Sequence, residues 1–203
     1  MFERFTKDAR EVVRTAAEHA ERAGAPSVDA EHILLALLDR EGSRASFALT
    51  SLGVTGERRE SVREAVAEAR RRAGLSRSEA DALADLGIDV SEIVARVEAV
   101  HGVGAMSGDR RDKGWWSGRR SFGRGAKQIL ETSLHTAVAQ GDRHIGDEHI
   151  LLALTARPGI PAEVLADLGV THESLIRVLF GGGGGRWGRA GVLGRGCPWG
   201  VLG

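Results

Sequence analysis

Cysteine is nearly absent from this sequence, and long apolar runs are absent altogether. Cys197 is the single cysteine among 203 residues, so neither a disulfide framework nor a cysteine-based zinc site can form within one chain. No apolar run approaches the about 18 residues that a membrane span needs. The N-terminal stretch MFERFTKDAR is charged and lacks the apolar centre of a signal peptide. We therefore expect a cytoplasmic protein with no membrane partner.

Lysine is also scarce, and its placement bears on catalysis. The three lysines are Lys7, Lys113 and Lys127, and none of them follows a glycine. A phosphate-binding P-loop needs the pattern G-x-x-x-x-G-K-[ST], so ATP hydrolysis of that kind is excluded for this sequence. A G-x-S-x-G elbow, an H-E-x-x-H zinc motif and a catalytic cysteine are missing as well. We predict that the chain is not an enzyme and that it uses no cofactor and no metal.

An excess of charge of one sign is missing too. The chain carries 28 Lys/Arg against 28 Asp/Glu, which gives no argument for a nucleic-acid partner, and we predict none. Basic residues exceed acidic ones in two glycine-rich stretches, which we interpret as a flexible linker at 103–121 and a disordered tail at 181–203. Weak RNA contact by their Arg-Gly pairs is an alternative. Trp115-Trp116 is either part of an unstructured linker or a short docking motif.

An internal repeat is the strongest positive signal. The letters EHILLAL occur at residues 31–37 and again at 148–154, and an identity of this length indicates two copies of one fold. The likeness continues on both sides at apolar positions and glycines, while exposed positions differ. The aligned pairs are Phe5 with Phe122, Ala9 with Ala126, Val12 with Ile129, Val13 with Leu130, Val28 with Ile145, and Leu52-Gly53-Val54 with Leu168-Gly169-Val170.

Apolar residues recur at three- and four-residue steps, which predicts helices in both copies. Gly24 and Pro26 end the first helix, and Asp29 is the expected N-cap of the second. Asp147 or the glycine before it has the same role in the second copy. No strand-like alternation of useful length occurs, so the predicted fold is all-α. The remaining helices are expected near 43–52, 57–73, 125–140, 147–156, 161–168 and 172–180.

The segment between the copies contains a partial third copy. LADLGIDVSEIVARVEAVHG at 83–102 is similar to LADLGVTHESLIRVLFG at 165–181. We predict two extra helices in 75–102, packed on the first copy with their apolar residues buried. The domain organisation is then a first repeat at 1–74, a helical insertion at 75–102, the linker, a second repeat at 122–180 and the tail. The residues expected to be buried are Leu83, Leu86, Ile88, Ile93, Val94 and Val97.

The repeat, with F-T near its start, a glycine turn, EHILLAL and LGV, resembles the N-terminal domain of the Clp/Hsp100 unfoldases, the ClpC type most of all. The resemblance covers about 2–73 and 121–180. It implies two tandem four-helix repeats that form one pseudo-twofold helical unit. In the family this unit precedes ATPase modules, and the sequence contains no P-loop, so we expect a stand-alone N-domain without its motor.

The resemblance also implies a ligand and the residues that bind it. ClpC-type domains recognise substrates and adaptors and bind phosphorylated arginine on client proteins. Carried over to this sequence, Glu31 and Glu148 bind the guanidinium group, and Arg4 and Thr6 bind the phosphate in the first copy. The second copy has Gly123 where the family has threonine, with Arg120 and Arg124 close by. Ala30, where the family commonly has a hydroxyl cap, is a further departure.

Each of these assignments has a simpler alternative. A glutamate in the first turn of a helix interacts favourably with the helix dipole without any ligand, by about 0.3–1 kcal/mol. His32 and His149 have the look of a metal pair, but they occupy equivalent places in separate copies and have no cysteine nearby. We therefore predict packing or hydrogen bonding for both histidines.

Two functions of different classes remain from the sequence. The first is a recognition or decoy module of the Clp proteolysis system, which binds degrons, phosphoarginine or Clp-directed peptides of client proteins. The second is a structural interaction module that docks on a Clp ATPase or another partner and modulates it. A third alternative, suggested by the glycine-rich tail, is a fragment of a decayed gene.

Overall fold

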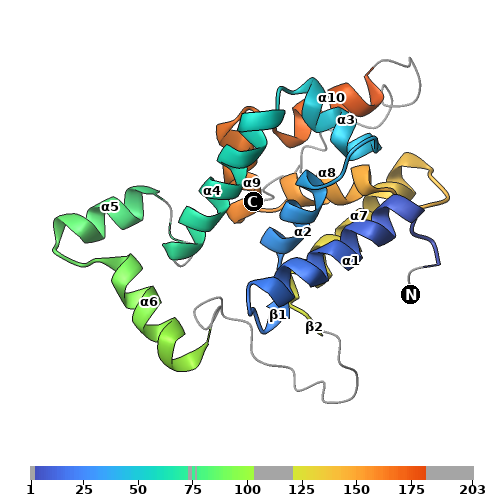
Figure 1. Ribbon diagram of the computed structural model, residues 1–203. Helices are drawn as coiled ribbons and strands as arrows, with labels where there is room; N and C mark the ends of the chain where they lie inside the picture. Colours follow the sequence, from blue (N-terminus) through green and yellow to red (C-terminus); the bar gives the residue numbers. More distant parts are fainter. Residues whose placement is uncertain (1–2, 73–74, 76, 103–120, 182–203) are drawn as a thin grey trace, which may run out of the picture.

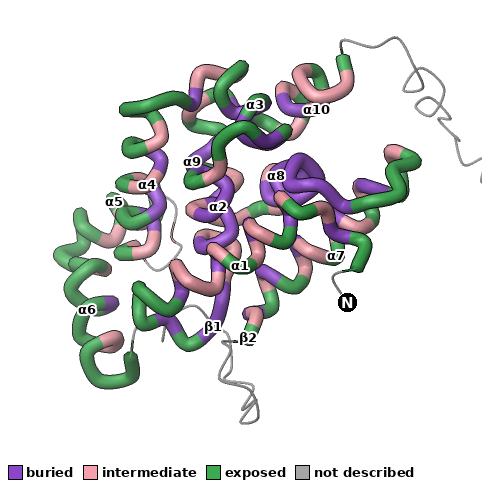
Figure 2. Tube along the Cα trace, turned by 45° about the vertical axis from the view of Figure 1, so that its right-hand side comes forward, coloured by how far each residue is buried: buried purple, intermediate pink, exposed green. Residues whose placement is uncertain are grey.

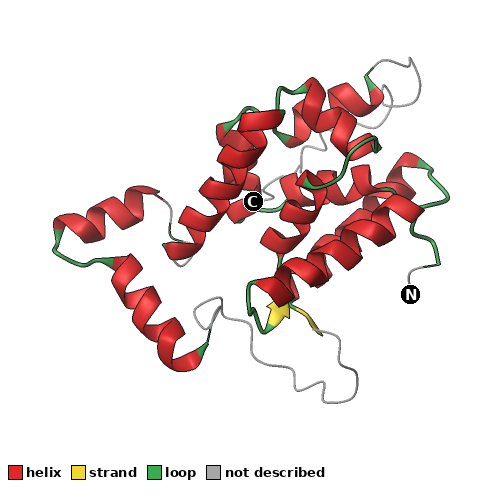
Figure 3. Ribbon diagram, viewed as in Figure 1, coloured by secondary structure: helices red, strands yellow, loops and turns green. Residues whose placement is uncertain are grey.

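The described part of the chain is almost entirely helical (Figures 1 and 3). A computed structural model describes residues 3–72, 75, 77–102 and 121–181. Arg120, Trp115-Trp116 and nearly all of the expected linker and tail lie outside these ranges. The all-α prediction is confirmed. None of the helices in the described ranges is long and apolar enough to cross a membrane.

Each copy forms the four predicted helices in the predicted order. The first copy has α1 (Lys7–Arg22), α2 (Ala30–Leu38), α3 (Arg44–Ser51) and α4 (Gly56–Arg71), and the second has α7 (Arg124–Gln140), α8 (Asp147–Thr155), α9 (Ile160–Asp167) and α10 (His172–Phe180). Side-chain hydroxyls start several of them, because each accepts one backbone N–H that the first turn leaves unpaired. Thr6, Ser43 and Thr171 accept in this way from the third residue after each.

The two EHILLAL helices form the centre of one shared core. Figure 2 shows α2 and α8 buried along most of their length, with the other helices of both copies around them. α2 and α8 contact each other, and α3 and α4 of the first copy contact α10 and α9 of the second. Apolar residues of both copies therefore belong to a single cluster, as predicted for two units with one interface. The largest fully buried apolar side chains are Ile33, Leu34, Leu37, Leu38, Leu49, Ile150, Leu151, Leu152, Leu154, Leu165 and Leu175.

Short strands join the copies in a crossed arrangement. β1 (Ser27–Val28), which precedes α2, pairs in parallel with β2 (Ser121–Phe122), which precedes α7. Phe5, which precedes α1, forms a parallel bridge with Ile145, which precedes α8. The start of each copy is therefore paired with the loop before the EHILLAL helix of the other copy. This exchange gives the unit its pseudo-twofold symmetry.

The insertion contains the two predicted helices, α5 (Arg77–Asp85) and α6 (Val90–His101). Asp89 is the N-cap of α6, and its side chain accepts the backbone N–H of Ser91 and Glu92. The prediction of burial is wrong for most of the apolar residues. Val94 alone among the six is buried, while Leu83 and Val97 are half-buried and Leu86, Ile88 and Ile93 are exposed. The two helices extend from α4 as an arm (Figure 1).

Candidate ligand-binding site

Glu31 and Glu148 occupy the same place in the two copies, the second residue of α2 and of α8. Each glutamate side chain lies near an arginine of another helix. The side chain of Glu31 is 13% exposed and that of Glu148 is 5% exposed. Such burial is unusual for a residue that only favours a helix dipole, because a carboxylate loses its hydration when it is buried.

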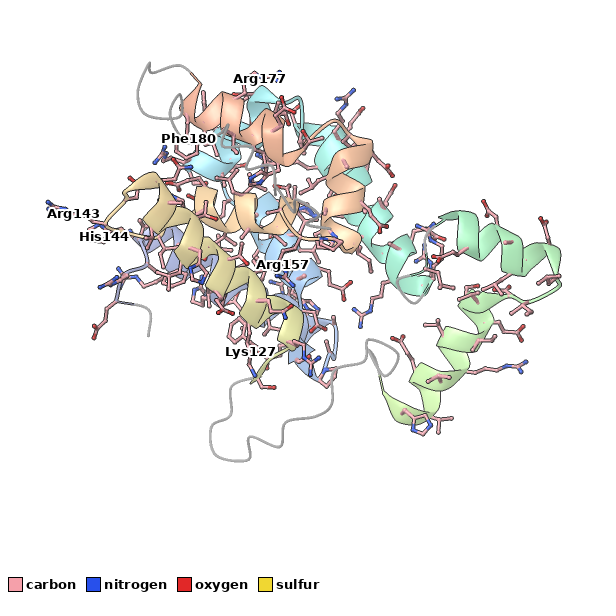
Figure 4. All side chains as sticks on the ribbon, turned by 180° about the vertical axis from the view of Figure 1, so that it is seen from behind. Lys127, Arg143, His144, Arg157, Arg177 and Phe180 are labelled. Carbon is pink, nitrogen blue, oxygen red and sulfur yellow. The ribbon has the colours of Figure 1, made fainter. Side chains whose placement is uncertain are left out.

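Glu148 is paired with an arginine from the other copy. Nη1 of Arg44, the first residue of α3, lies 2.7 Å from Oε1 of Glu148. The guanidinium carbon of Arg44 also lies 5.9 Å from the ring centre of Phe180, at the end of α10 (Figure 4), within cation–π range. Burial raises the pKa of Glu148, and the charge of Arg44 opposes that rise. The carboxylate is therefore held by one cation in a poorly solvated place.

The loop before α8 leaves room for this carboxylate only because it contains a glycine. A Cβ atom at Gly146 would lie 2.0 Å from Oε2 of Glu148. The equivalent residue before α2 is Asp29, so the two glutamates have different surroundings. The chain therefore holds the Glu148 carboxylate folded back over its own helix start.

Glu31 has a looser partner. Oε1 of Glu31 lies 3.6 Å from Nη1 of Arg70, near the end of α4. Burial raises the pKa of Glu31, Arg70 opposes the rise, and the charges of Asp29 and of Glu98 on α6 add to it. Three carboxylates therefore share the neighbourhood of one arginine, and the site has a negative balance.

A second buried carboxylate distinguishes the two helix starts. Asp147 is buried, and its Oδ2 accepts the backbone N–H of Ala45, the second residue of α3, at 3.2 Å. The equivalent positions in the other half are Ala30 and Pro161. Alanine has no acceptor, and proline has no N–H to donate. The half that contains Ala30 and Pro161 therefore lacks both the acceptor and the donor of this hydrogen bond. Neither position leaves a buried polar group without its partner.

His32 and His149 have a hydrogen-bonding role, as predicted. Nδ1 of His32 accepts the backbone N–H of Asp29, and Nδ1 of His149 accepts that of Gly146, both at 2.9 Å. In the neutral ring the proton is then on Nε2, which in His149 lies 3.1 Å from Oδ2 of Asp142. Burial lowers the pKa of His149, which favours this neutral form. Each histidine closes the turn that begins an EHILLAL helix.

Because the strands pair across the copies, the other predicted site residues lie near a different glutamate from the one that sequence order suggests. The N–H of Thr6 donates to the carbonyl of Ile145 at 2.9 Å, and the N–H of Ile145 donates to the carbonyl of Arg4 at 2.8 Å. Ile145 precedes Glu148 by three residues. Arg4 and Thr6 therefore lie at the loop that leads into Glu148, and their assignment to the Glu31 site is wrong.

Gly123 and Arg124 lie at the opposite loop. The N–H of Gly123 donates to the carbonyl of Val28 at 2.9 Å, three residues before Glu31. Gly123 is the N-cap of α7, in the place that Thr6 has for α1. The side chain of Arg124 is exposed. The threonine that the second copy lacks is therefore missing beside Glu31 and not beside Glu148.

Several residues that the sequence did not single out complete these sites. Arg44 and Arg70 come from helices whose packing on the EHILLAL helices cannot be deduced from spacing alone. Arg143 and His144 are exposed and directly precede Ile145 (Figure 4), so they lie beside Arg4 and Thr6 at the same edge. The aligned positions Phe5/Phe122 and Val28/Ile145 were the available signal for Arg143 and His144, because the structure pairs Phe5 with Ile145 and Val28 with Phe122 across the copies.

An open groove lies next to Arg44. It encloses about 330 Å³ between the start of α3 and the end of α10. Its walls are mostly apolar apart from Ser43 and Arg44, and Phe47 on its rim is exposed. The groove is therefore suited to an apolar side chain next to a charged group. The lining residues are Gly42, Ser43, Arg44, Phe47, Val178 and Leu179.

A duplicated four-helix unit with exchanged strands and a buried or half-buried glutamate at each central helix start defines a class of helical-repeat domain. Residues 4–82 and 121–181 match the family described as Clp repeat (R) N-terminal domain. The chain belongs to this family. The match leaves residues 83–120, which include α6, between its two parts.

Similar proteins include chaperones of plants and bacteria. The chain is 30% identical over 176 residues to the chloroplastic chaperone protein ClpC1 of Arabidopsis thaliana, across 86% of this chain and 14% of that protein. It is 32% identical over 172 residues to the chaperone protein ClpB of Oceanobacillus iheyensis, across 84% of this chain and 16% of that protein. The chain thus spans about one seventh of the length of the curated relatives that it matches.

A solved structure shares the fold. The N-terminal domain of the chaperone ClpD from Arabidopsis thaliana superposes with a TM-score of 0.50 at 20% identity, over 88% of this chain and 94% of that domain. The match includes nearly the whole of the solved domain, so the similarity concerns the arrangement of both copies.

Proposed function

We propose that this chain is a non-catalytic recognition module of a Clp proteolysis system, which binds phosphorylated arginine side chains of client proteins. The proposal rests on one observation. Each helix-start glutamate is mostly buried and already pairs with a guanidinium group of its own chain, Arg44 at Glu148 and Arg70 at Glu31. A carboxylate offers two acceptor oxygens to the planar donors of an arginine. A client's guanidinium would take the place of the internal one.

The phosphate of such a ligand would lie at the start of α1. Thr6 and the exposed Arg4, Arg143 and His144 flank the bridged residues Phe5 and Ile145 in the sequence, and the first turn of α1 contributes the positive end of its helix dipole. Hydroxyl and guanidinium groups are suited to a phosphate dianion. Because this edge leads into Glu148, we propose that Glu148, Thr6 and Arg4 form the stronger site.

The second site is the weaker one in this proposal. On the Glu31 side the N-cap is Gly123, which lacks the hydroxyl that Thr6 has in the same place of the other copy, and the surroundings of Glu31 contain two further carboxylates, Asp29 and Glu98. These negatively charged carboxylates repel the phosphate of a ligand, although they attract its guanidinium. Arg120 belongs to the same proposed site by its position in the sequence.

Calorimetric titration of the full chain with free phosphoarginine tests the proposal. Glu148→Ala should lower the affinity about 10–150-fold, because a hydrogen bond to a charged group contributes about 1.5–3 kcal/mol. Glu31→Ala should have a smaller effect. Glu163→Ala, an exposed first-turn glutamate of α9, is the matched control and should have none. Absence of phosphoarginine binding by the wild-type chain would contradict the proposal.

Docking on a Clp ATPase is the second candidate, and the groove beside Phe47 favours it. An exposed aromatic residue at the rim of an apolar groove is a common anchor at protein interfaces. A pull-down with the full chain and with Phe47→Ser distinguishes the two functions. Client proteins retained by both forms support recognition, whereas a Clp ATPase lost with Phe47→Ser supports docking. Both functions act by binding, so ATP turnover by the purified chain would contradict both.

A further inference from the structure

The α5–α6 arm carries an unusual share of the exposed apolar surface. Six large apolar side chains in the described ranges are exposed, and four of them lie between residues 86 and 100. Figure 2 shows the arm mostly exposed, in contrast to the buried centre of the two copies. Single exposed apolar residues are normal, but a group of them on one element indicates an interaction surface. The four are Leu86, Ile88, Ile93 and Val100.

The apolar residues of α6 form two adjacent faces. Val94 is buried, and α6 contacts α4. Ile93, Val97 and Val100 follow one another at four- and three-residue steps, so they form a stripe beside Val94. Ile93 and Val100 in this stripe are exposed. Attachment to α4 therefore uses one face of α6 and leaves a second apolar face uncovered.

The same sequence pattern is buried elsewhere in this chain. α5 and α6 repeat the pattern LADLG followed by an apolar residue that α9 and α10 also have. Ile88 and Ile93 of the arm align with Val170 and Leu175, which are both fully buried. The hairpin of α9 and α10 packs on the apolar EHILLAL helix α8. The arm thus has the apolar pattern of a hairpin that packs on a helix, without a helix to cover it.

The net negative charge of the arm limits the kind of partner that can bind it. Its sequence over 77–102 contains six Asp/Glu and two Arg. Glu98 lies on α6 near Glu31, whose pKa it helps to raise, so the acidic surface continues into the negative neighbourhood of α2. A basic partner is attracted to this surface, and an acidic one is repelled.

A second copy of this chain does not meet these requirements. Two arms would bring like charges together. The helices that α9 and α10 cover, α8 above all, are buried within their own chain and are not available to an arm from another molecule. The partner must therefore supply an apolar helix face and positive charge.

We propose that the α5–α6 arm docks a basic amphipathic helix of a partner protein, with the apolar stripe of that helix over Ile88, Ile93 and Val100 and its cationic side chains toward the acidic residues of the arm, Glu98 among them. The surface is independent of the phosphoarginine proposal, because it needs neither Glu148 nor the start of α1. Most of it also lies outside the residues that match the Clp repeat family. It is thus an addition to the two repeats, by which a separate partner can be held.

The probe is a fluorescein-labelled peptide of about 18 residues made only of leucine and lysine, with leucine at the spacing of one helical face. Its binding to the full chain is measured by fluorescence anisotropy. The proposal predicts binding that weakens as salt increases, because exposed charges are screened. A Leu/Glu peptide of the same pattern should not bind, and a Leu/Lys peptide with strictly alternating residues should bind much more weakly.

Variants of the chain locate the binding surface. Ile93→Ser combined with Val100→Ser should lower the affinity about tenfold or more, the effect expected when central apolar anchors are lost. Val138→Ser is the matched control, since Val138 on α7 is 63% exposed and Val100 is 78% exposed; it should leave the affinity unchanged. Circular dichroism confirms folding, because all three side chains are on the surface.

Three results would overturn the proposal. They are equal loss of affinity in the arm variant and in Val138→Ser, equal affinity for the Leu/Glu peptide, and sedimentation that shows the unliganded chain as a dimer which the arm variant dissociates. The last result would make a second copy the occupant of the arm. Phosphoarginine binding measured on the same variants should be unchanged, so failure of one proposal leaves the other testable.

Discussion

Removal of the guanidinium group beside Glu148 should reveal how strongly the fold opposes that buried charge. The substitution is Arg44→Gln, which keeps a polar side chain of similar length at the start of α3. Glu148 then retains its burial but loses the cation that lies 2.7 Å away. The ionised carboxylate loses the positive charge that opposes the effect of its burial, so the free energy of unfolding should fall.

The exposure of the two partners sets the size of this loss. A hydrogen bond between charged groups contributes about 1.5–3 kcal/mol when it is sheltered, and an exposed ion pair contributes about 0.2–1 kcal/mol. Glu148 is almost fully buried, but the Arg44 side chain is 55% exposed, which discounts the upper range. We expect a loss of about 1–2 kcal/mol at neutral pH. The contact of Arg44 with Phe180 adds about 0.5 kcal/mol that does not depend on pH.

The loss of stability in Arg44→Gln should depend on pH in a defined direction. Burial raises the pKa of Glu148 in the folded state, so the folded protein binds this proton more tightly than the unfolded chain. The stability contributed by the protonated carboxyl is complete below the unfolded pKa of about 4.3, and it is lost as pH rises through the folded pKa. Arg44→Gln raises the folded pKa further. The difference between variant and wild type should therefore be small near pH 4 and should grow toward pH 7.

Urea unfolding followed by circular dichroism from pH 4 to pH 8 measures this difference. Arg177→Gln is the matched control, because Arg177 pairs with Glu173 on the surface of α10 at 3.0 Å (Figure 4) and should lose less than about 0.5 kcal/mol. Glu148→Gln completes a double-mutant cycle that separates the ion pair from the contact with Phe180. Equal losses of stability in Arg44→Gln and Arg177→Gln, or a loss for Arg44→Gln that does not change with pH, would contradict this expectation.

Two further substitutions test the neighbourhood of Glu148. Gly146→Ala should force the Glu148 carboxylate away, because a Cβ there would lie 2.0 Å from Oε2; phosphoarginine affinity measured by calorimetry should fall several-fold and the melting temperature should fall as the pair with Arg44 is lost, and unchanged affinity would contradict this. Asp147→Ala should lower the free energy of unfolding by about 1–3 kcal/mol, since it leaves a buried backbone N–H without its acceptor. The reciprocal Ala30→Asp should give no gain in urea unfolding, and a gain would show that another donor is available there.

The repeat made most of the fold predictable from the sequence. Two occurrences of EHILLAL, each with matching apolar positions before and after it, predicted two four-helix units and their shared interface. Asp29 was expected as an N-cap and is one. These features are local, because a cap and an apolar stripe depend on residues within a few positions of each other.

The contacts between the copies could not be predicted in the same way. Sequence order places Thr6 with Glu31, whereas the structure places it at the loop before Glu148. The pairing of Arg44 with Glu148 depends on how α3 packs against α8, which spacing along the chain does not encode. The role of the two glutamates in ligand binding therefore stays a prediction, while the residues grouped around each of them differ from those that sequence order suggested.

The arm shows a different limit. Its apolar residues were expected to be buried because apolar surface in water is unfavourable. Ile93 follows the pattern of the buried Leu175 but is exposed. The sequence pattern indicates an apolar surface that can be buried, but it does not show whether the packing partner belongs to the same chain.

The exchanged strands have a consequence for how the chain tolerates its insertion. Phe5 pairs with Ile145 and Val28 pairs with Phe122 across the copies, the kind of reciprocal contact by which two identical subunits assemble about a twofold axis. A covalent connection then serves mainly to keep the two partners at high effective concentration. The entropy of closing a loop grows slowly, by about 0.6 kcal/mol for each doubling of its length. The connection between the copies can therefore acquire a whole helical hairpin such as α5–α6 at little thermodynamic cost.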